Sequence, residues 1–510
     1  MRSVSRVLAL VAIVGTCLSS TAAATKEAAQ ACHWITKLIP GYVDYPNSTQ
    51  YEIDNTYWSQ QQRAVHPHCF VRPSNATEVG AIMRVLVRFN STFNVKSGGF
   101  SPFAGASNVE GGVTIDLGRM NKTKEILDGS TMSAGPAARY YGLYRYYDNM
   151  KNAGMGPKNG DLTVAGYVLG CGFTFFPQNS GFACDNVNNY ELVTVKGDII
   201  RVNRKVNPEL FSAIRGGGAS SFGIVTRFDI VRFWQKKTWW NHLQFPASLN
   251  SEVMDVYGNL SLKGHGFDLF GHSFLISTYS EDYQDFVTDI HIIYTEYDFL
   301  HYRMPGIAEP FQRIRGALKN VTEVNGAANF SSRFNEPPGN RYSSWSTSVA
   351  VDKPEFLTEI LANWQVLDRK LKGIANVNQS DFKSVLEFQP VSRRMLWNMR
   401  RHGHNAWGIT TGSGPMMFVL LSLTWTDPTL DRIIEVEARR YIDNIDNTAK
   451  QIDQYRGFIH MNYAHPSQDV FGRFNPQSIE RLRHVAKMYD PDGALHRLWR
   501  GYFKLNRVDV

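Results

Sequence analysis

The stretch Phe93–Asn121 reads FNVKSGGFSPFAGASNVEGGVTIDLGRMN, and it has a glycine-rich centre between two apolar ends. Its apolar ends, 93–95 and 112–117, predict two short strands joined by a tight loop. The loop contains glycines, which permit backbone conformations and close approaches that a side chain would block: Gly98, Gly99 and Gly105. Several backbone N–H groups can therefore converge on one anion, and the loop favours a pyrophosphate group as its ligand.

A second glycine-rich stretch, Val164–Val187, reads VAGYVLGCGFTFFPQNSGFACDNV. Its closely spaced glycines allow the backbone to lie against a flat ring, and its apolar residues can exclude water from that ring. Taken alone, the stretch would favour a simple glycine-rich turn between strands.

Further motifs follow in order along the chain. Residues 207–218 read NPELFSAIRGGG, and residues 221–228 read SFGIVTRF. Near the C-terminus, residues 458–464 read FIHMNYA and residues 501–505 read GYFKL. A lone triple glycine would be weak evidence of function, so these motifs gain weight only when they are taken together.

These motifs resemble those of the FAD-linked oxidases of the berberine-bridge-enzyme-like group. The resemblance implies an α+β fold, with a two-lobed FAD-binding domain of the PCMH or vanillyl-alcohol-oxidase type and a substrate domain of antiparallel sheet covered by helices. The alternating run 417–424 favours such a sheet. The expected limits are a signal peptide at 1–24, an N-terminal segment at 25–63, the FAD-binding domain at 64–233, the substrate domain at 234–455 and a C-terminal segment at 456–510 that returns to the FAD-binding domain.

The resemblance also implies which residues contact FAD. They come from the pyrophosphate loop, the second glycine-rich stretch, the backbone near residue 224 and the C-terminal motif. The expected contacts are Lys96, Ser97, Gly98, Gly99, Phe100, Ser101, Gly105, Gly166, Gly170, Gly172, Asn186, Gly223, Ile224, Val225 and Asn462.

Both positions at which members of this family can bond FAD covalently carry other residues here. The histidine of the loop motif is replaced by Phe100, and the anchoring cysteine of some relatives aligns with Asn159. No cysteine occurs between Cys69 and Cys171. We therefore expect FAD to be bound non-covalently.

The cysteines and the N-terminus point to the secretory pathway. Arg2 and Arg6 precede the apolar run 7–18, and small residues end near Ala24, as in a cleaved signal peptide. The resemblance implies a disulfide between Cys32 and Cys69, whereas the apolar surroundings of Cys171 and Cys184 favour buried thiols over a metal pair. Sequons for glycosylation occur at Asn47, Asn75, Asn90, Asn121, Asn259, Asn320, Asn329 and Asn378.

Composition excludes several classes of function. The formal charge of +8 is spread along the chain without a Lys/Arg-rich block, so we expect no nucleic-acid partner. The apolar run 7–18 is too short to span a bilayer comfortably, and we expect no membrane partner. The pairs His66/His68 and His402/His404 lack a spaced carboxylate or cysteine partner, so no metal site is expected. A hydrolase is excluded as well, because the sequence contains neither a G-x-S-x-G elbow nor a P-loop.

Two helices can be delimited from their caps. Ser74 is expected to cap a helix whose apolar residues, including Val79 and Met83, share one face. Asn475 is expected to cap a C-terminal helix with Pro476 at its first position.

Flavin-dependent oxidation needs a base for one proton and an acceptor for a hydride, and O2 can then recycle the flavin. The candidate bases are Tyr463 and His460, which occupy the C-terminal motif. The aromatic-rich segment after residue 234 favours a small, largely apolar natural product as substrate. The alternatives are a non-redox cyclase or isomerase with structural or absent flavin and, more remotely, a binding protein without catalysis. We expect a monomer.

Overall fold

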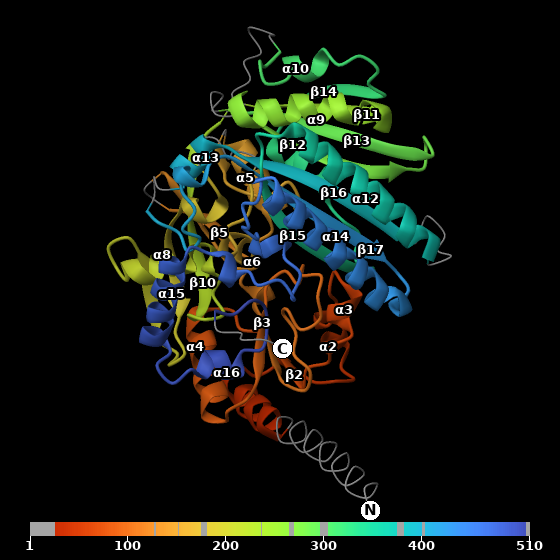
Figure 1. Cartoon of the computed structure of the whole chain (residues 1–510). Helices are drawn as coiled ribbons and strands as arrows, with labels where there is room; N and C mark the ends of the chain where they lie inside the picture. Colours follow the sequence, from red (N-terminus) through yellow and green to blue (C-terminus); the bar gives the residue numbers. More distant parts are fainter. Residues whose placement is uncertain are drawn as a thin grey trace, which may run out of the picture.

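The computed structural model of the chain describes residues 26–126, 129–150, 152–174, 181–235, 237–264, 270–295, 304–374, 382–399 and 403–505. The expected signal peptide, the sequon at Asn378 and His402 lie outside these described residues. The expected α+β class is confirmed, with three sheets and helices packed on them (Figure 1).

The first sheet carries the pyrophosphate loop. Its strands have the order β1-β2-β4-β3, and β2 and β3 each run parallel to β4. The loop therefore joins two parallel neighbours, and Lys96 at the end of β3 lies opposite Asp116 at the end of β4. The strands are β1 (Val43–Asp44), β2 (Cys69–Val71), β3 (Phe93–Lys96) and β4 (Val113–Asp116).

The helix between β2 and β3, α4 (Ala76–Arg88), has Asn75 as its N-cap, so the expectation for Ser74 was wrong by one residue. The Asn75 Oδ1 accepts a hydrogen bond from the Glu78 backbone N–H at 2.9 Å. Ser74 instead donates from its hydroxyl and its backbone N–H to the Glu78 carboxylate. The apolar face of α4 is buried as expected.

The second sheet is antiparallel and has the order β5-β6-β10-β8-β9, with β7 also paired to β10. Helices α5 (Tyr140–Asn149), α6 (Val164–Leu169) and α8 (Pro208–Gly217) belong to this part of the chain. The strands are β5 (Thr123–Glu125), β6 (Thr131–Ala134), β7 (Asn152–Gly154), β8 (Val187–Val193), β9 (Ile199–Asn203) and β10 (Ile224–Trp234).

The third sheet is antiparallel, with seven strands in the order β14-β11-β13-β12-β16-β17-β15. Helices α9 (Asn250–Asn259), α12 (Pro354–Ile374) and α14 (Asp431–Gln451) pack on one face (Figure 1). The strands are β11 (Thr238–Pro246), β12 (Gly271–Ser280), β13 (Asp285–Tyr294), β14 (Lys319–Asn325), β15 (Arg341–Ala350), β16 (Phe382–Val391) and β17 (Met416–Trp425).

Alternation along β17 shows how this sheet separates two cores. Met417 and Val419 join the core under the helices, whereas Met416 and Phe418 join the core shared with the second sheet. Because successive side chains of a strand point to opposite faces, the inner face of the third sheet is directed at the second. Short helices complete the fold: α2 (Thr49–Asp54), α3 (Gln60–Arg63), α10 (Glu309–Gln312), α11 (Ala327–Ser331) and α13 (Arg393–Asn398).

The C-terminal segment returns to the first two sheets. The helix α15 (Pro476–Tyr489) contacts α8, and its N-cap is Asn475, as expected. The short helix α16 (Ala494–Leu498) leads to Trp499, which forms a parallel bridge with Phe93. In Figure 1 these blue C-terminal helices accordingly lie beside the red and yellow early part of the chain.

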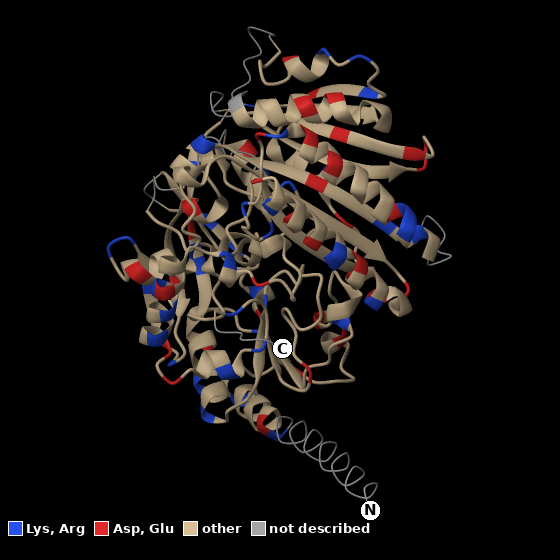
Figure 2. Ribbon diagram, in the orientation of Figure 1, with Lys and Arg blue, Asp and Glu red and all other residues tan. Residues whose placement is uncertain are grey.

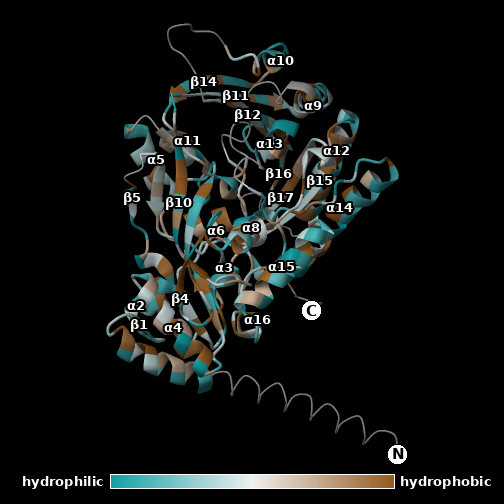
Figure 3. Cartoon of the chain, turned by 90° about the vertical axis from the view of Figure 1, so that its left-hand side faces the viewer, coloured by the Kyte–Doolittle hydropathy of each residue, from teal (hydrophilic) through white to brown (hydrophobic). Residues whose placement is uncertain are grey.

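Charge and hydropathy follow this layering. Figure 2 shows positive and negative residues interspersed along the helices, and Figure 3 shows hydrophobic segments concentrated in the sheets. Among the described residues, no helix is both long and apolar enough to cross a membrane.

Two disulfides are present. Cys32–Cys69 ties the N-terminal helical residues to β2, as expected. Cys171 and Cys184 are also bonded to each other, so the expectation of buried thiols was wrong. Apolar surroundings suit a buried thiol and a buried disulfide equally, and the sequence offered no means to separate them.

Candidate functional site

A cavity of about 600 Å³ lies between the glycine motifs and the inner face of the third sheet. Its size is within the usual range for small-molecule sites. We call the glycine side, residues 97–101, 166–170 and 218–225, the cradle, and the inner face of β16 and β17 the roof. The expected site residues that line the cavity are Ser97, Gly98, Gly99, Phe100, Ser101, Gly166, Gly170, Ile224, Val225, Asn462 and Tyr463.

The pyrophosphate loop has the conformation that its glycines permit. Gly99 has φ +67°, and a Cβ there would lie 2.9 Å from the Tyr57 ring, so the position requires glycine. The Ser97 hydroxyl is 3.1 Å from that of Thr163, which fixes the loop against the start of α6. The Ser101 Oγ is buried and has no hydrogen-bond partner within the described residues.

Lys96 does not face the cavity, although it directly precedes the loop. Its Nζ lies 3.0 Å from the Asp116 carboxylate and also donates to the backbone carbonyl of Asp54. The lysine therefore stabilises the base of the loop and is not available as a cation for a ligand in the cavity.

Gly166 in α6 and Gly170 at the C-cap of this helix form a second wall of the cradle. A Cβ on Gly166 would meet no atom within 4 Å, so this glycine borders open space. A Cβ on Gly170 would lie 1.8 Å from the Asn462 Oδ1, so only glycine allows the C-terminal motif to pack here.

Four expected contacts lie behind the cavity wall. A Cβ on Gly172 would overlap the Tyr167 ring, and one on Gly223 would lie 2.5 Å from the Val193 carbonyl oxygen. Gly105 has φ +75° and accepts a hydrogen bond from Asn94, while Asn186 donates to the Phe182 carbonyl. Packing explains the residue types at Gly172 and Gly223, and the positive φ explains the one at Gly105, while contact of the four residues with FAD stays a prediction.

The Cys171–Cys184 disulfide lies directly behind the cradle. It joins the chain just after α6 to the 3-10 helix Ala183–Asn186. With Asp185 these cysteines form the one cluster of three potential metal ligands among the described residues, but the bonded sulfurs leave no thiolates for a metal. Burial raises the pKa of Asp185 to about 6, although Arg215 pairs with it at 2.9 Å.

His460 is fully buried and does not line the cavity, which argues against its expected role as a base. Its Nδ1 accepts a hydrogen bond from the Asn462 backbone N–H, and its Nε2 lies 3.2 Å from the Cys171 carbonyl oxygen. Burial lowers the pKa of this imidazole to about 4. The neutral ring therefore links the C-terminal motif to the disulfide segment.

Asn462 connects the cradle to the C-terminus. Its Nδ2 donates to the Tyr167 carbonyl at 3.1 Å, and its Oδ1 accepts from the Tyr502 hydroxyl at 3.2 Å. Both ends of the amide are thus fixed beside Gly170.

Tyr463 lines the cavity and faces the roof. Desolvation raises the pKa of its phenol well above the usual value, the Glu387 carboxylate raises it further, and a hydrogen bond with Gln389 opposes the shift. The phenol therefore stays protonated near neutral pH, and it is better suited to donate a hydrogen bond than to remove a proton.

The roof contributes charged residues that the sequence motifs did not reveal. Glu387 on β16 is buried, lines the cavity and accepts hydrogen bonds at Oε1 from Lys158 and, at 2.6 Å, from Gln389. Glu336 and Lys158 line the same part of the cavity. Desolvation raises the pKa of Glu336, the Lys158 ammonium opposes this shift, and the Glu387 carboxylate adds to it.

A signal for Glu387 was present in the sequence. Residues 382–391 read FKSVLEFQPV, in which Glu387 and Gln389 interrupt an apolar strand on one face. Burial of a charged residue in such a strand is rare without a partner or a function. None of the family motifs includes this strand, so they gave no indication of Glu387.

Comparison with known proteins agrees with this geometry. A family described as FAD binding domain matches residues 67–203. A curated relative, the FAD-dependent monooxygenase tpcD of Cochliobolus heterostrophus, is 27% identical over 92% of this chain and 90% of its own length. The chain is an FAD-dependent oxidoreductase, and this assignment is consistent with its resemblance to the berberine-bridge-enzyme-like group. These matches favour an oxidoreductase over a non-redox cyclase or isomerase.

Solved structures share the fold of this oxidoreductase. The berberine-bridge-enzyme-like protein 1 of Physcomitrella patens has a TM-score of 0.73 at 15% identity, covering 94% of this chain and 100% of that one. A glucooligosaccharide oxidase from Acremonium strictum, described with 6-S-cysteinyl, 8α-N1-histidyl FAD, has a TM-score of 0.74 at 14% identity, covering 94% of this chain and 100% of that one.

The residues of the cradle fit FAD. Gly99 and Gly170 allow the backbone close approach that a pyrophosphate and a flat ring require, and the unpaired Ser101 hydroxyl can serve a phosphate oxygen. Space beside Gly166 is open to a ring.

Proposed function

We propose that this oxidoreductase binds FAD non-covalently and oxidises a small, largely apolar natural product that carries a hydroxyl group. One observation carries the non-covalent part. Among the described residues that line the cavity there is neither a histidine nor a cysteine, whereas the glucooligosaccharide oxidase carries FAD bonded to both residue types. Phe100 lines the cavity where the resemblance places the histidine, and phenylalanine cannot form that bond.

The roof supplies the base. FAD, when bound, supplies the acceptor for the hydride that leaves the hydroxyl-bearing carbon. Glu387 removes the hydroxyl proton, because it is the buried carboxylate on the cavity, and Tyr463 donates a hydrogen bond that orients the substrate oxygen. The substrate thereby loses two electrons and two protons and becomes a carbonyl compound.

Oxygen accepts the electrons in this scheme. One O2 takes up two electrons and two protons and leaves as hydrogen peroxide. The curated relatives suggest a second candidate, since tpcD and a second relative, FUP4 of Fusarium proliferatum, are called FAD-dependent monooxygenases. In that case one oxygen atom would enter the product and the other would leave as water, with a reduced nicotinamide as electron donor.

Purified protein tests the cofactor and the reaction together. We expect flavin absorption bands and release of all the FAD into the supernatant on acid precipitation. Incubation with a panel of small benzylic and allylic alcohols should form aldehyde and peroxide in equal amounts. Flavin that stays with the precipitated protein would contradict non-covalent binding, and 18O from labelled O2 in the product would favour the monooxygenase.

Two further properties belong to the proposal. Disulfides form in oxidising compartments, so the two bridges support folding in the secretory pathway. Deglycosylation of protein from the native host should then lower its apparent mass. We also propose a monomer, which light scattering of the purified protein tests.

A further inference from the structure

Lys158 connects the two halves of the site. It follows β7 and precedes α6, so its backbone belongs to the side that forms the cradle. Its side chain crosses to the roof, where the ammonium pairs with Glu387. The side chains of this pair are 26% and 6% exposed, so the pair is largely shielded from water.

The ammonium is also held by aromatic rings. The Lys158 Nζ lies 4.7 Å from the ring centre of Phe274 and 5.8 Å from that of Phe334. Cation–π attraction and the ion pair therefore act on one shielded cation, and both are stronger there than at a water-exposed site.

The two oxygens of the Glu387 carboxylate differ in their partners. Oε1 accepts from both Lys158 and Gln389. Oε2 accepts no hydrogen bond from the described residues. Because this atom is not completely buried and Glu387 lines the cavity, Oε2 is open to the cavity. Only one oxygen of this carboxylate is free to receive a proton.

We propose that Lys158 is a positioning residue for proton removal: its ammonium holds Oε1 of Glu387 in place, so that Oε2 points at the substrate hydroxyl. The proposal rests on the proposed function, because it needs Glu387 as the base. In this scheme Lys158 acts on the reaction only through Glu387.

Loss of the ammonium has a second effect on the same carboxylate. Glu336 interacts electrostatically with both Lys158 and Glu387. Without the cation, the repulsion between the two carboxylates is no longer opposed, and Glu387 turns away from its present orientation. The base is then present but misdirected, which lowers kcat more than it changes KM.

Lys158→Met tests the inference, because methionine keeps most of the side-chain volume and removes the charge. With the best alcohol of the panel as probe, we expect kcat to fall about tenfold or more, KM to change less than about twofold, and FAD content to stay the same. Lys158→Arg keeps the charge and should recover most of kcat. An unchanged kcat, or a change confined to KM, would overturn the proposal.

Lys370→Met is the matched control. Lys370 forms a 2.7 Å ion pair with Glu437 between α12 and α14, away from the cavity. This variant also loses a lysine that pairs with a buried glutamate, and it should keep the parent kcat. Equal losses in both variants would mean that the effect is a general loss of stability.

A double variant separates this inference from the assignment of the base. In the Glu387→Gln background, Lys158→Met should have no further effect on kcat, since Lys158 acts through the carboxylate. If the two losses multiply, the positioning role is wrong. If Glu387→Gln alone turns over at the parent rate, the base assignment fails instead.

A crystal structure of Lys158→Met provides a readout without a substrate. We expect the Glu387 side chain to leave its present rotamer and Oε1 to lose its position beside Gln389. An unmoved carboxylate would contradict the inference. Should the methionine variant fold poorly, Lys158→Gln serves for the same measurement.

Discussion

The cradle and the roof face each other across one cavity, but they are built by different means. The cradle consists mainly of backbone, and its residue types are set by space, as at Gly99 and Gly170. The roof consists of side chains, among them Glu387 and Gln389, held by partners from distant parts of the chain. Backbone recognition therefore leaves contiguous glycine motifs in a sequence, whereas side-chain chemistry leaves isolated residues.

The largest expected effect separates chemistry on the roof from binding in the cradle. Glu387→Gln keeps the size of the side chain and removes its ability to take up a proton. We expect kcat with the best alcohol of the panel to fall about 100-fold or more, with unchanged FAD content. The control is Glu437→Gln, which makes the same change at a buried glutamate in α14. Loss of FAD from Glu387→Gln would show that the two regions are not separable.

The next effect concerns the cradle. Gly170→Ala should weaken FAD binding about 100-fold, because the added Cβ would meet the Asn462 Oδ1 at 1.8 Å and displace this amide. Titration of the apoprotein with FAD, followed by flavin fluorescence, measures the change. Gly142→Ala on α5, where a Cβ would meet no atom within 4 Å, should bind FAD as the parent does. If the parent chain, Gly170→Ala and Gly142→Ala all bind FAD with equal affinity, FAD binding does not depend on the close approach that Gly170 permits.

A substitution at His460 tests whether this buried histidine, which contacts the disulfide segment behind the cradle, has a structural role. Its pKa is about 4 in the folded chain against 6.5 as the ordinary value, so the unfolded state binds the proton more tightly. Stability is therefore full above pH 6.5 and is lost as the pH falls towards 4, by about 3 kcal/mol in all. His460→Gln should flatten this dependence, which thermal midpoints at pH 7 and pH 4.5 measure.

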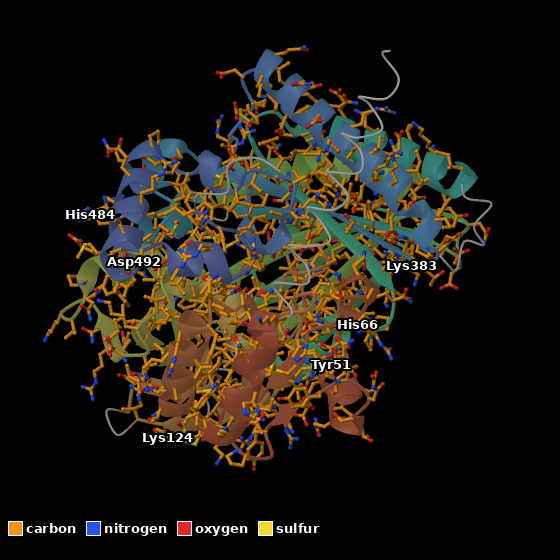
Figure 4. The ribbon with its side chains drawn as sticks, turned by 90° about the horizontal axis from the view of Figure 1, so that it is seen from below. Tyr51, His66, Lys124, Lys383, His484 and Asp492 are labelled. Atoms are coloured by element: carbon orange, nitrogen blue, oxygen red, sulfur yellow. A yellow bond between two sulfur atoms is a disulfide. The ribbon has the colours of Figure 1, made fainter. Side chains whose placement is uncertain are left out.

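The control for that experiment is His484→Gln, since His484 lies exposed on α15 (Figure 4). Its pH dependence should match that of the parent chain. If His460→Gln remains as acid-sensitive as the parent, another group causes the acid loss.

The smallest effect is expected at Tyr463, which lies on the cradle side and faces the roof. A residue that only donates a hydrogen bond contributes less than a base, so Tyr463→Phe should lower kcat about tenfold. A loss as large as that of Glu387→Gln would restore Tyr463 as the base. Turnover at the parent rate would remove it from the reaction.

The contrast between the cradle, built mainly of backbone, and the roof, built of side chains, also explains which features could be predicted from the sequence. The strands around the pyrophosphate loop, the cap at Asn475 and the Cys32–Cys69 bridge were predicted, because each rests on a local motif or on the family resemblance. The α+β class and the oxidoreductase assignment followed from the family resemblance that the motifs carry.

The remaining features depend on contacts that no local pattern specifies. Ser74 and Asn75 are both good caps, and the choice between them depends on how Glu78 folds back. Lys96 was expected at the ligand because of the family resemblance, but its carboxylate partner lies on the neighbouring strand. Glu387 and Lys158 are far apart in the sequence and meet only through the packing of the roof on the cradle.

The Cys171–Cys184 bridge has a practical consequence for recombinant production. A bacterial cytosol keeps thiols reduced, so chains made there would have a cradle whose rear wall is untethered. The yield of yellow protein from different hosts would then report their redox conditions as well as the affinity of the protein for flavin. Colourless material from such a host is no evidence against a flavoenzyme.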